Sequence, residues 1–375
     1  MPTKKQVNYI GVDVLTEAKK RIRHVMNCFD SIYVAFSGGK DSLAVLYLVE
    51  EVYREMGMSD RVSVIFRDEE LIPDSVIDFV QWHYHQKDRF DLRYYAVPLA
   101  NQRYIFGALR PYIQWDIKRK WIRPKPEFAI GSWGKAWDEN PGIQHDVDRK
   151  TFEGEPGKIA LINGVRADES LTRYRSCVNK RNENYINATA AKNVKFVKPI
   201  FDWSQKDVFK YFYDRKIKYC KIYDMQMWAR VNLRVATPLH AKAFKTLSKM
   251  RAMYPIFYDQ MLSIWPDIDA HAIYWGNVDR LGIIKKYPAS WAGIEQYIVD
   301  NIPPENQAFV TEILRSRRVI RHNNIQSGMV ENFGGYPALH IFRSIVVGDY
   351  LKGIQPKHPK AITKEEREYE AMFTG

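Results

Sequence analysis

The sequence predicts an α/β fold in which helices lie on both faces of a mainly parallel, twisted sheet, followed by a mainly helical C-terminal region. Short β-rich runs alternate with segments of helical period over the first 225 residues, as in parallel sheets with right-handed crossovers. Several of these runs end abruptly in glycine or in charged residues. Beyond about residue 225 the β-rich runs become rare, which favours helices there.

The first part of the chain predicts two strand-to-helix units after an N-terminal helix. In that helix Ala18, Ile22 and Val25 recur at intervals of three and four, and Thr16 stands where an N-cap is expected. The β-rich runs that follow end in turn residues, and helical period resumes after each. The expected elements are a helix over 16–29, a strand over 31–36, a helix from 42, a strand over 61–66 and a helix that begins at 73–75.

Three more strands are expected, and a helix follows the last of them. They cover 92–99, 159–164 and a run from 194, and the helix is capped at Asp202 or Ser204. Ligands of open α/β sheets bind at the carboxyl ends of parallel strands. Functional side chains are therefore expected directly after Phe36, Phe66 and Gly164.

Three regions follow from this order. Residues 1–30 form an N-terminal helix, residues 31–225 the main α/β domain with an irregular insertion at 101–157, and residues 226–375 the mainly helical region. In the stretch 103–125 seven residues are basic and one is acidic, with aromatic side chains between them. This mix can stack on nucleic-acid bases while neutralising phosphates. Aromatic packing beneath a solvated basic face is the alternative.

The composition, with 46% hydrophobic and 27% charged residues, is that of a globular protein. No apolar run reaches 18 residues and the N-terminus lacks a signal-peptide core, so a cytoplasmic protein without a membrane segment is expected. The three cysteines form no CxxC, which argues against disulfides and structural zinc, and no iron–sulfur cluster is expected. The net charge of +13 favours a nucleotide, nucleic acid or acidic protein as partner. The oligomeric state stays open.

The sequence SGGKDS (residues 37–42) joins the first expected strand to the next helix. A helix begins with unpaired N–H groups and the positive end of its dipole, and both attract a phosphate. Gly38 and Gly39 can adopt positive φ and have no Cβ that would keep a phosphate away. The other side chains offer a positive charge, two hydroxyl donors and a carboxylate that can hold Mg²⁺ or orient the lysine: Lys40, Ser37, Ser42 and Asp41.

A second anion-binding pattern, INGVRADESLTRYRS, begins in the strand expected at 159–164. Gly164 opens the end of that strand. Arg166, Arg173 and Arg175 can converge on an anion in bidentate fashion. Glu169 can fix one of these arginines, and a surface helix with ion pairs such as Glu169 with Arg173 is the alternative explanation.

SGGKDS at a strand-to-helix turn resembles the PP-loop of the adenine nucleotide α-hydrolase superfamily, whose enzymes bind ATP and cleave it between the α- and β-phosphates. INGVRADESLTRYRS resembles the Gly-x-Arg-x-x-Glu-Ser-x-x-Arg element of the phosphoadenosine phosphosulfate (PAPS) reductase branch, in which arginines meet the phosphate or sulfate end of the nucleotide. Over roughly residues 14–265 the chain is similar to PAPS reductase-like proteins of the immunoglobulin-binding regulator A type.

The resemblance implies an adenine nucleotide α-hydrolase-like fold that binds ATP with Mg²⁺. Lys40, Asp41, Arg166 and Arg173 would act on the reacting phosphates, with Asp41 as a Mg²⁺ ligand. Asp68 matches an acidic position near the adenosine. A ParB-like protein partner is also implied, because family members often occur beside one. The implied nucleotide-binding residues are Ser37, Gly38, Gly39, Lys40, Asp41, Ser42, Asp68, Gly164, Arg166, Glu169, Ser170 and Arg173.

The resemblance does not extend to the catalytic cysteine of PAPS reductases. PAPS reductases attack the sulfonate sulfur with a thiolate carried in a C-terminal Glu-Cys-Gly-x-His type motif. No such motif occurs in this chain, and no cysteine follows Cys220. Cys177 lies within the arginine-rich run, where a structural cysteine is the simpler interpretation. A thiol-dependent PAPS reductase is therefore not expected.

Two functions of different classes remain open. One is an enzyme that cleaves ATP between its α- and β-phosphates and transfers or releases AMP, with use of PAPS itself as a variant. The other is a nucleotide-sensing regulatory or nucleic-acid-binding protein that holds a polyanion through residues 103–125. Pyrophosphate release that depends on Lys40 would favour the enzyme, and salt-dependent binding of DNA or RNA would favour the regulator.

Overall fold

The computed structural model describes residues 11–105, 108–178, 183–239, 247–274, 282, 284–288, 290–315, 338–346 and 363–371. The chain divides into two compact units. Unit 1 comprises Met1–Asn101 and Ile113–Thr237, and unit 2 comprises Gln102–Tyr112 and Pro238–Gly375.

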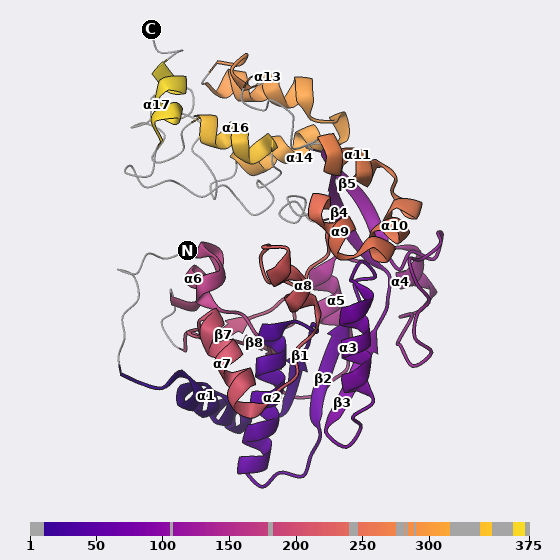
Figure 1. The fold of residues 1–375 in the computed structure, drawn as a ribbon, viewed down its shortest axis with the longest axis vertical. Coiled ribbons are helices and arrows are strands. Elements are labelled where there is room, and N and C mark those ends of the chain that lie inside the picture. The colour runs from indigo at the N-terminus through magenta and orange to yellow at the C-terminus, as the bar shows by residue number, and fades with distance from the viewer. Residues whose placement is uncertain are drawn as a thin grey trace. The chain divides into compact units, whose positions relative to one another are not determined.

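The centre of unit 1 is a six-stranded sheet with the strand order β3-β2-β1-β6-β8-β7 (Figure 1). Neighbouring strands pair in parallel, except that β7 is antiparallel to β8. The mainly parallel sheet predicted from the sequence is confirmed. Its strands are β1 (Ser31–Ala35), β2 (Val62–Arg67), β3 (Phe90–Tyr95), β6 (Ile159–Ile162), β7 (Ile186–Ala188) and β8 (Val194–Val197).

The register brings the carboxyl ends of the central strands to one edge of the sheet, because Val34 of β1 lies opposite Val64 of β2 and Ile162 of β6. Side chains alternate along β1, as expected for a strand. Tyr33 packs in an apolar cluster that includes Leu161, whereas the next residue, Val34, is fully buried outside that cluster. Both faces of the sheet are therefore covered.

The helices of unit 1 lie around this sheet, and α1, α2 and α7 pack side by side (Figure 1). The expected N-cap of the first helix, Thr16, is wrong, because Asp13 is the cap and its carboxylate accepts from the Thr16 N–H at 2.8 Å. Of the two candidate caps of α7, Ser204 is the one that accepts from the Asp207 N–H. The helices are α1 (Val14–Cys28), α2 (Lys40–Glu55), α3 (Asp74–Tyr84), α4 (Lys135–Glu139), α5 (Gln144–Thr151), α6 (Leu171–Val178), α7 (Gln205–Arg215) and α8 (Ile222–Trp228).

The region expected to be irregular contains regular structure. β4 (Leu99–Ile105) and β5 (Ala108–Gln114) form a two-stranded sheet, and α4 and α5 follow. The strand expected over 92–99 is in fact two, because β3 ends at Tyr95 and β4 begins at Leu99. Pro98 stands between them and has no N–H for a β-ladder, which accounts for the break.

Unit 2 is mainly helical in its described residues, as predicted. Arg103, from the β4–β5 sheet, forms an ion pair of 2.7 Å with Asp267 within this unit. Parts of the expected C-terminal helices, and Phe106 of the aromatic stretch, lie outside the described residues. Nowhere in the described ranges is a helix both long and apolar enough to span a membrane. The helices are α9 (Leu247–Met253), α10 (Pro255–Ile264), α11 (Asp267–Tyr274), α13 (Trp291–Asn301), α14 (Pro304–Arg315), α16 (Ala338–Val346) and α17 (Lys364–Ala371).

Candidate functional site

The glycine turn between β1 and α2 uses one left-handed residue. Gly38 has φ +72°, and a Cβ at this position would stand 2.7 Å from the Cγ1 of Val76. Gly39, at φ −84°, is the N-cap of α2 and has no side chain that could occupy the helix N-terminus. Gly38 is thus required by both conformation and space, while Gly39 leaves the first turn of α2 accessible.

Hydroxyl groups hold the turn in place. The Ser42 hydroxyl accepts from the Ser37 N–H at 3.1 Å and donates to the Gly39 carbonyl at 3.0 Å. The Lys40 N–H, at the start of α2, donates to the Tyr223 hydroxyl at 2.6 Å. Tyr223 therefore occupies a position at the helix N-terminus where an anion would otherwise accept a hydrogen bond.

Asp41 joins two cations of the site. Its carboxylate accepts from Lys40 Nζ at 2.7 Å through Oδ2 and from Arg166 Nε at 2.7 Å through Oδ1. Arg166 also pairs with Asp168, 2.6 Å away. The Lys40 side chain is only 4% exposed, and burial lowers the pKa of its ammonium while Asp41 raises it. The lysine is thus held inside the site by a carboxylate that a phosphate could replace.

Gly164 lets the end of β6 touch the first turn of α2. A Cβ on Gly164 would lie 2.4 Å from the carbonyl carbon of Asp41 and 2.6 Å from the Ser42 nitrogen. Such distances are far below van der Waals contact, so a larger residue cannot fit without moving the backbone. The two motifs identified in the sequence therefore meet through this glycine.

The remaining residues of the arginine-rich run have different surroundings. The Arg173 guanidinium pairs with the Glu169 carboxylate, and its pKa is lowered first by burial and then by the positive charge of Arg234. The Ser170 hydroxyl accepts from the Arg173 N–H at 3.2 Å. Arg175 is exposed. Both the predicted anion-binding role and the predicted ion pair of Glu169 with Arg173 are compatible with this arrangement.

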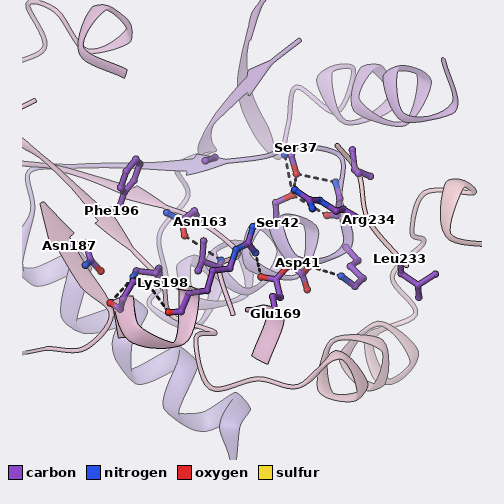
Figure 2. Close-up of a pocket in the computed structure, with 18 of the residues that line it drawn as sticks. Ser37, Asp41, Ser42, Asn163, Glu169, Asn187, Phe196, Lys198, Leu233 and Arg234 are labelled. Atoms are coloured by element: carbon purple, nitrogen blue, oxygen red, sulfur yellow. Dashed lines mark hydrogen bonds and ion pairs between the residues drawn. The ribbon is translucent and has the colours of Figure 1, made fainter. Parts of the chain in front are cut away.

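A cavity of about 850 Å³ extends along the edge of the sheet from the end of β2 to β7 (Figure 2). A volume of this order fits a nucleotide-sized ligand. Of the predicted residues, those that line the cavity are Ser37, Gly39, Lys40, Asp41, Ser42, Gly164, Glu169 and Arg173. Gly38, Asp68, Arg166 and Ser170 do not line it.

The Asp68 side chain binds other residues inside the protein and does not face the cavity. Its buried carboxylate accepts from the Tyr94 hydroxyl and from the Arg123 guanidinium, both at 2.5 Å, and burial raises its pKa. The next residue, Glu69, lines the cavity instead, and its pKa is raised by burial and by the charge of Asp68. Neighbouring side chains at a strand end point in opposite directions. Because Asp68 points into the protein, the adjacent acidic residue Glu69 is the one that the sequence indicates for the cavity.

Other lining residues were not predicted. Tyr223 and Arg234 come from the segment after α7, and Asn187 and Lys198 come from β7 and the end of β8. Gln226 holds the backbone of Arg234, accepting from its N–H at 2.8 Å and donating to its carbonyl at 2.7 Å. No short motif marks these residues, because the fold alone brings them to the site.

Within the basic and aromatic stretch 103–125, the part that belongs to unit 1 begins at Ile113 and makes contacts inside that unit. Trp115 is fully buried, and its indole N–H donates to the Asp68 carbonyl at 2.6 Å. Arg119 forms an ion pair of 2.7 Å with the buried Glu70. The Lys125 ammonium lies 4.5 Å from the ring centre of Trp121. These contacts favour the packing interpretation for these side chains, and nucleic-acid binding by the stretch stays a prediction.

None of the cysteines lines the cavity. Cys177 is fully buried, with its Sγ 3.8 Å from Lys198 Nζ. Cys220 is buried too, and burial raises the pKa of its thiol to about 11. Across the described part of the chain, no group of three or more His, Cys, Asp or Glu side chains is placed to hold a metal ion.

Part of the chain matches a known domain family. Residues 131–273 match the model of the phosphoadenosine phosphosulfate reductase domain. This part of the chain is therefore similar to a PAPS reductase domain. The matched residues include the whole arginine-rich run, and the SGGKDS turn precedes them. The chain is also 23% identical over 312 residues to the "Uncharacterized protein YbdN" of Escherichia coli K12, covering 78% of this chain and 76% of that protein.

Three solved structures similar to this chain are a PAPS reductase, an FMN adenylyltransferase and a tRNA thiolase. The PAPS reductase of Candida auris has a TM-score of 0.34 at 12% identity, with 56% of this chain and 84% of that chain covered. The FMN adenylyltransferase of Candida glabrata has a TM-score of 0.38 at 12% identity, covering 58% and 64%. The U34-tRNA thiolase NcsA of Methanococcus maripaludis has a TM-score of 0.32 at 14% identity, covering 71% and 83%.

Proposed function

We propose that this protein binds ATP in the cavity beside the SGGKDS turn, cleaves it between the α- and β-phosphates, and transfers or releases AMP. One observation carries the proposal: a glycine turn at a helix N-terminus and a buried lysine share a cavity with two arginines, Arg173 and Arg234. Helix N-terminal amides and buried cations stabilise phosphate groups more strongly than exposed ones. The match to the PAPS reductase domain supports an enzyme.

In this reaction an acceptor oxygen forms a bond to the α-phosphorus. The bond from the α-phosphorus to the bridging oxygen of the β-phosphate breaks, and pyrophosphate leaves with its electron pair. The Lys40 ammonium would neutralise the pyrophosphate, and the Lys40 N–H would add a hydrogen bond once it leaves the Tyr223 hydroxyl. Arg173 would steady the charge on the transferred phosphate, held in position by Glu169.

We propose that Mg²⁺ enters as part of the MgATP substrate. Both oxygens of Asp41, the candidate ligand, already accept hydrogen bonds from cations of the protein. A single carboxylate is a poor resident site for Mg²⁺, which prefers several oxygen ligands in octahedral geometry. The nucleotide phosphates supply such oxygens, so the residues present fit an ion that arrives with its substrate.

The arrangement of the cysteines argues against a thiol-dependent PAPS reductase. A thiolate nucleophile has to reach the sulfonate sulfur of the bound nucleotide. Cys177 and Cys220 are buried outside the cavity, and Cys28 lies at the end of α1. AMP transfer is therefore preferred over sulfonate reduction, and the use of PAPS as a ligand is an outcome of the test below.

The proposal is tested by assaying pyrophosphate release from ATP and adenosine 3′,5′-bisphosphate release from PAPS. We expect pyrophosphate from ATP, and a loss of about 10²- to 10³-fold in kcat for Lys40→Met, because the variant lacks a charge that stabilises the leaving group. Lys206→Met, which changes an exposed lysine of α7, is the matched control and should keep full activity. Activity that persists in Lys40→Met would refute the proposal.

A further inference from the structure

The cavity continues well beyond the phosphate-binding turn. Figure 2 shows Ser37 and Arg234 near one end of the cavity and Asn187, Phe196 and Lys198 together near the other. The turn follows β1, and β6 separates β1 from β8 in the sheet. A nucleotide whose phosphates lie at the turn therefore leaves the β7–β8 end of the cavity for a second molecule.

A buried cation stands at this end. Lys198 directly follows β8 and is only 5% exposed. Its ammonium donates to the Ser176 carbonyl at 3.1 Å and to the Ser176 hydroxyl at 3.0 Å. These two hydrogen bonds fix the direction of the ammonium. A positive charge fixed in a cavity wall attracts an anionic group of a ligand, since little water competes for it.

The neighbouring strand, β7, offers a hydrogen-bond acceptor, the side chain of Asn187. Asn187 of β7 is directly opposite Phe196 of β8 in the antiparallel register, and both line the cavity. The Asn187 Oδ1 atom is buried and has no hydrogen-bond partner among the residues that the structure describes. A buried polar atom left without a partner is destabilising by about 1–3 kcal/mol, so a ligand N–H or O–H would be favoured here.

We propose that the β7–β8 end of the cavity is the acceptor subsite, and that the acceptor is a small organic acid that also carries a hydroxyl or amino group. The carboxylate pairs with Lys198, the hydroxyl or amino group donates to Asn187, and the apolar part of the acid packs on Phe196. This inference rests on the proposed AMP transfer, because it assigns the second substrate of that reaction.

The lining of this end also suits a nucleophile that needs no base. Its residues are Ser176, Asn187, Ala188, Phe196 and Lys198, and none of these side chains can take a proton from an alcohol at neutral pH. A carboxylate is already ionised at that pH. Its oxygen can bond to the α-phosphorus as pyrophosphate leaves, giving an acyl adenylate with no proton to remove.

The test uses two fragment-sized acids in the presence of saturating α,β-methylene-ATP. Glycolate has a carboxylate and a hydroxyl, whereas acetate has the carboxylate alone. We expect the full-length protein to bind glycolate about 3- to 10-fold more tightly than acetate, measured by ligand-observed NMR titration. Asn187→Ala should remove this preference. Lys198→Met should weaken both acids at least about 10-fold, while Lys198→Arg should retain most of the binding.

Lys195→Met is the matched control, since Lys195 lies in β8, the strand that Lys198 follows, but does not line the cavity. Thermal unfolding checks that each variant is folded. Unchanged binding in Lys198→Met, or equal binding of glycolate and acetate by the wild type, would overturn the inference. If the nucleotide analogue binds and neither acid does, the inference fails while the proposed function stands. If the acids bind at Lys198 and the analogue does not, the subsite stands and the proposed function fails.

Discussion

At the scale of single residues, Asp41 pairs with two cations, and a nucleotide in the cavity would compete with it for Lys40. Its carboxylate contacts Lys40 from the glycine turn and Arg166 from the run after β6. The same carboxylate therefore neutralises the site before a ligand binds and links the two motifs. A phosphate that replaces Asp41 as the partner of Lys40 would leave Asp41 paired with Arg166. The negative charge of the carboxylate would therefore stay compensated throughout binding.

His83 is a buried titratable residue outside the site, and it makes stability depend on pH. Its ring packs against Phe36 and Phe79, its Nδ1 lies 2.8 Å from the Phe79 carbonyl, and burial lowers its pKa to about 4. In the unfolded chain the pKa is about 6.5. Between these values the unfolded state binds a proton that the folded state does not, so stability falls as the pH drops below about 6.5.

Because pH 5 lies about 1.5 pH units below the pKa of this histidine in the unfolded chain, we expect its protonation to lower the free energy of unfolding by about 2 kcal/mol between pH 7 and pH 5. Urea denaturation at both pH values measures it. His83→Phe should lose this part of the pH dependence, whereas His85→Phe, which changes an exposed histidine, should keep it. An equal pH dependence in wild type and His83→Phe would show that His83 is not the cause.

At the scale of elements, the strand–turn–helix around SGGKDS was predictable because its signals are local. A β-rich run, two glycines and a helical period lie within residues 31–56 of the sequence. Tyr223 and Lys198 were not predictable in this way, since they reach the site only when α8 packs beside the sheet and β8 pairs with β6. Asp68 was predicted at the nucleotide and instead binds Arg123, a long-range ion pair with no sequence signal.

The contact of β6 with α2 gives a prediction about these two elements. Gly164→Ala would place a methyl group 2.4 Å from the Asp41 carbonyl carbon, so the end of β6 must move away from the first turn of α2. We expect a loss of about 1–3 kcal/mol in the free energy of unfolding, typical of overpacking. We also expect weaker binding of α,β-methylene-ATP, because the moved turn carries Lys40 and Asp41.

Gly131→Ala is the control for this change, since its methyl group would meet Lys125 Cδ at an ordinary 3.4 Å. Thermal unfolding and nucleotide titration of both variants supply the measurements. If Gly164→Ala matches the wild type in both, the close approach of β6 to α2 has no bearing on stability or binding.

At the scale of the whole molecule, the sequence predicted the main elements of both units but not which segments make up unit 2. The alternation of strands and helices predicted the sheet of unit 1, and the scarcity of β-rich runs predicted the helices of unit 2. That Gln102–Tyr112 belongs with Pro238–Gly375 was not apparent, because the link depends on contacts such as that of Arg103 with Asp267, which are remote in sequence. Such pairings carry no periodic signal.

The division into units predicts two unfolding transitions, because each unit has its own buried core. The cavity is lined by residues of unit 1 alone, so α,β-methylene-ATP at about 100 times its Kd should stabilise that unit by about 2.7 kcal/mol and raise its Tm by about 5–10 °C. Differential scanning calorimetry measures both transitions. Met261→Ala, in the core of unit 2, should lower the other transition and so identify it, while Lys40→Met should abolish the shift caused by the nucleotide. A nucleotide-induced shift in the transition that Met261→Ala lowers would contradict binding within unit 1.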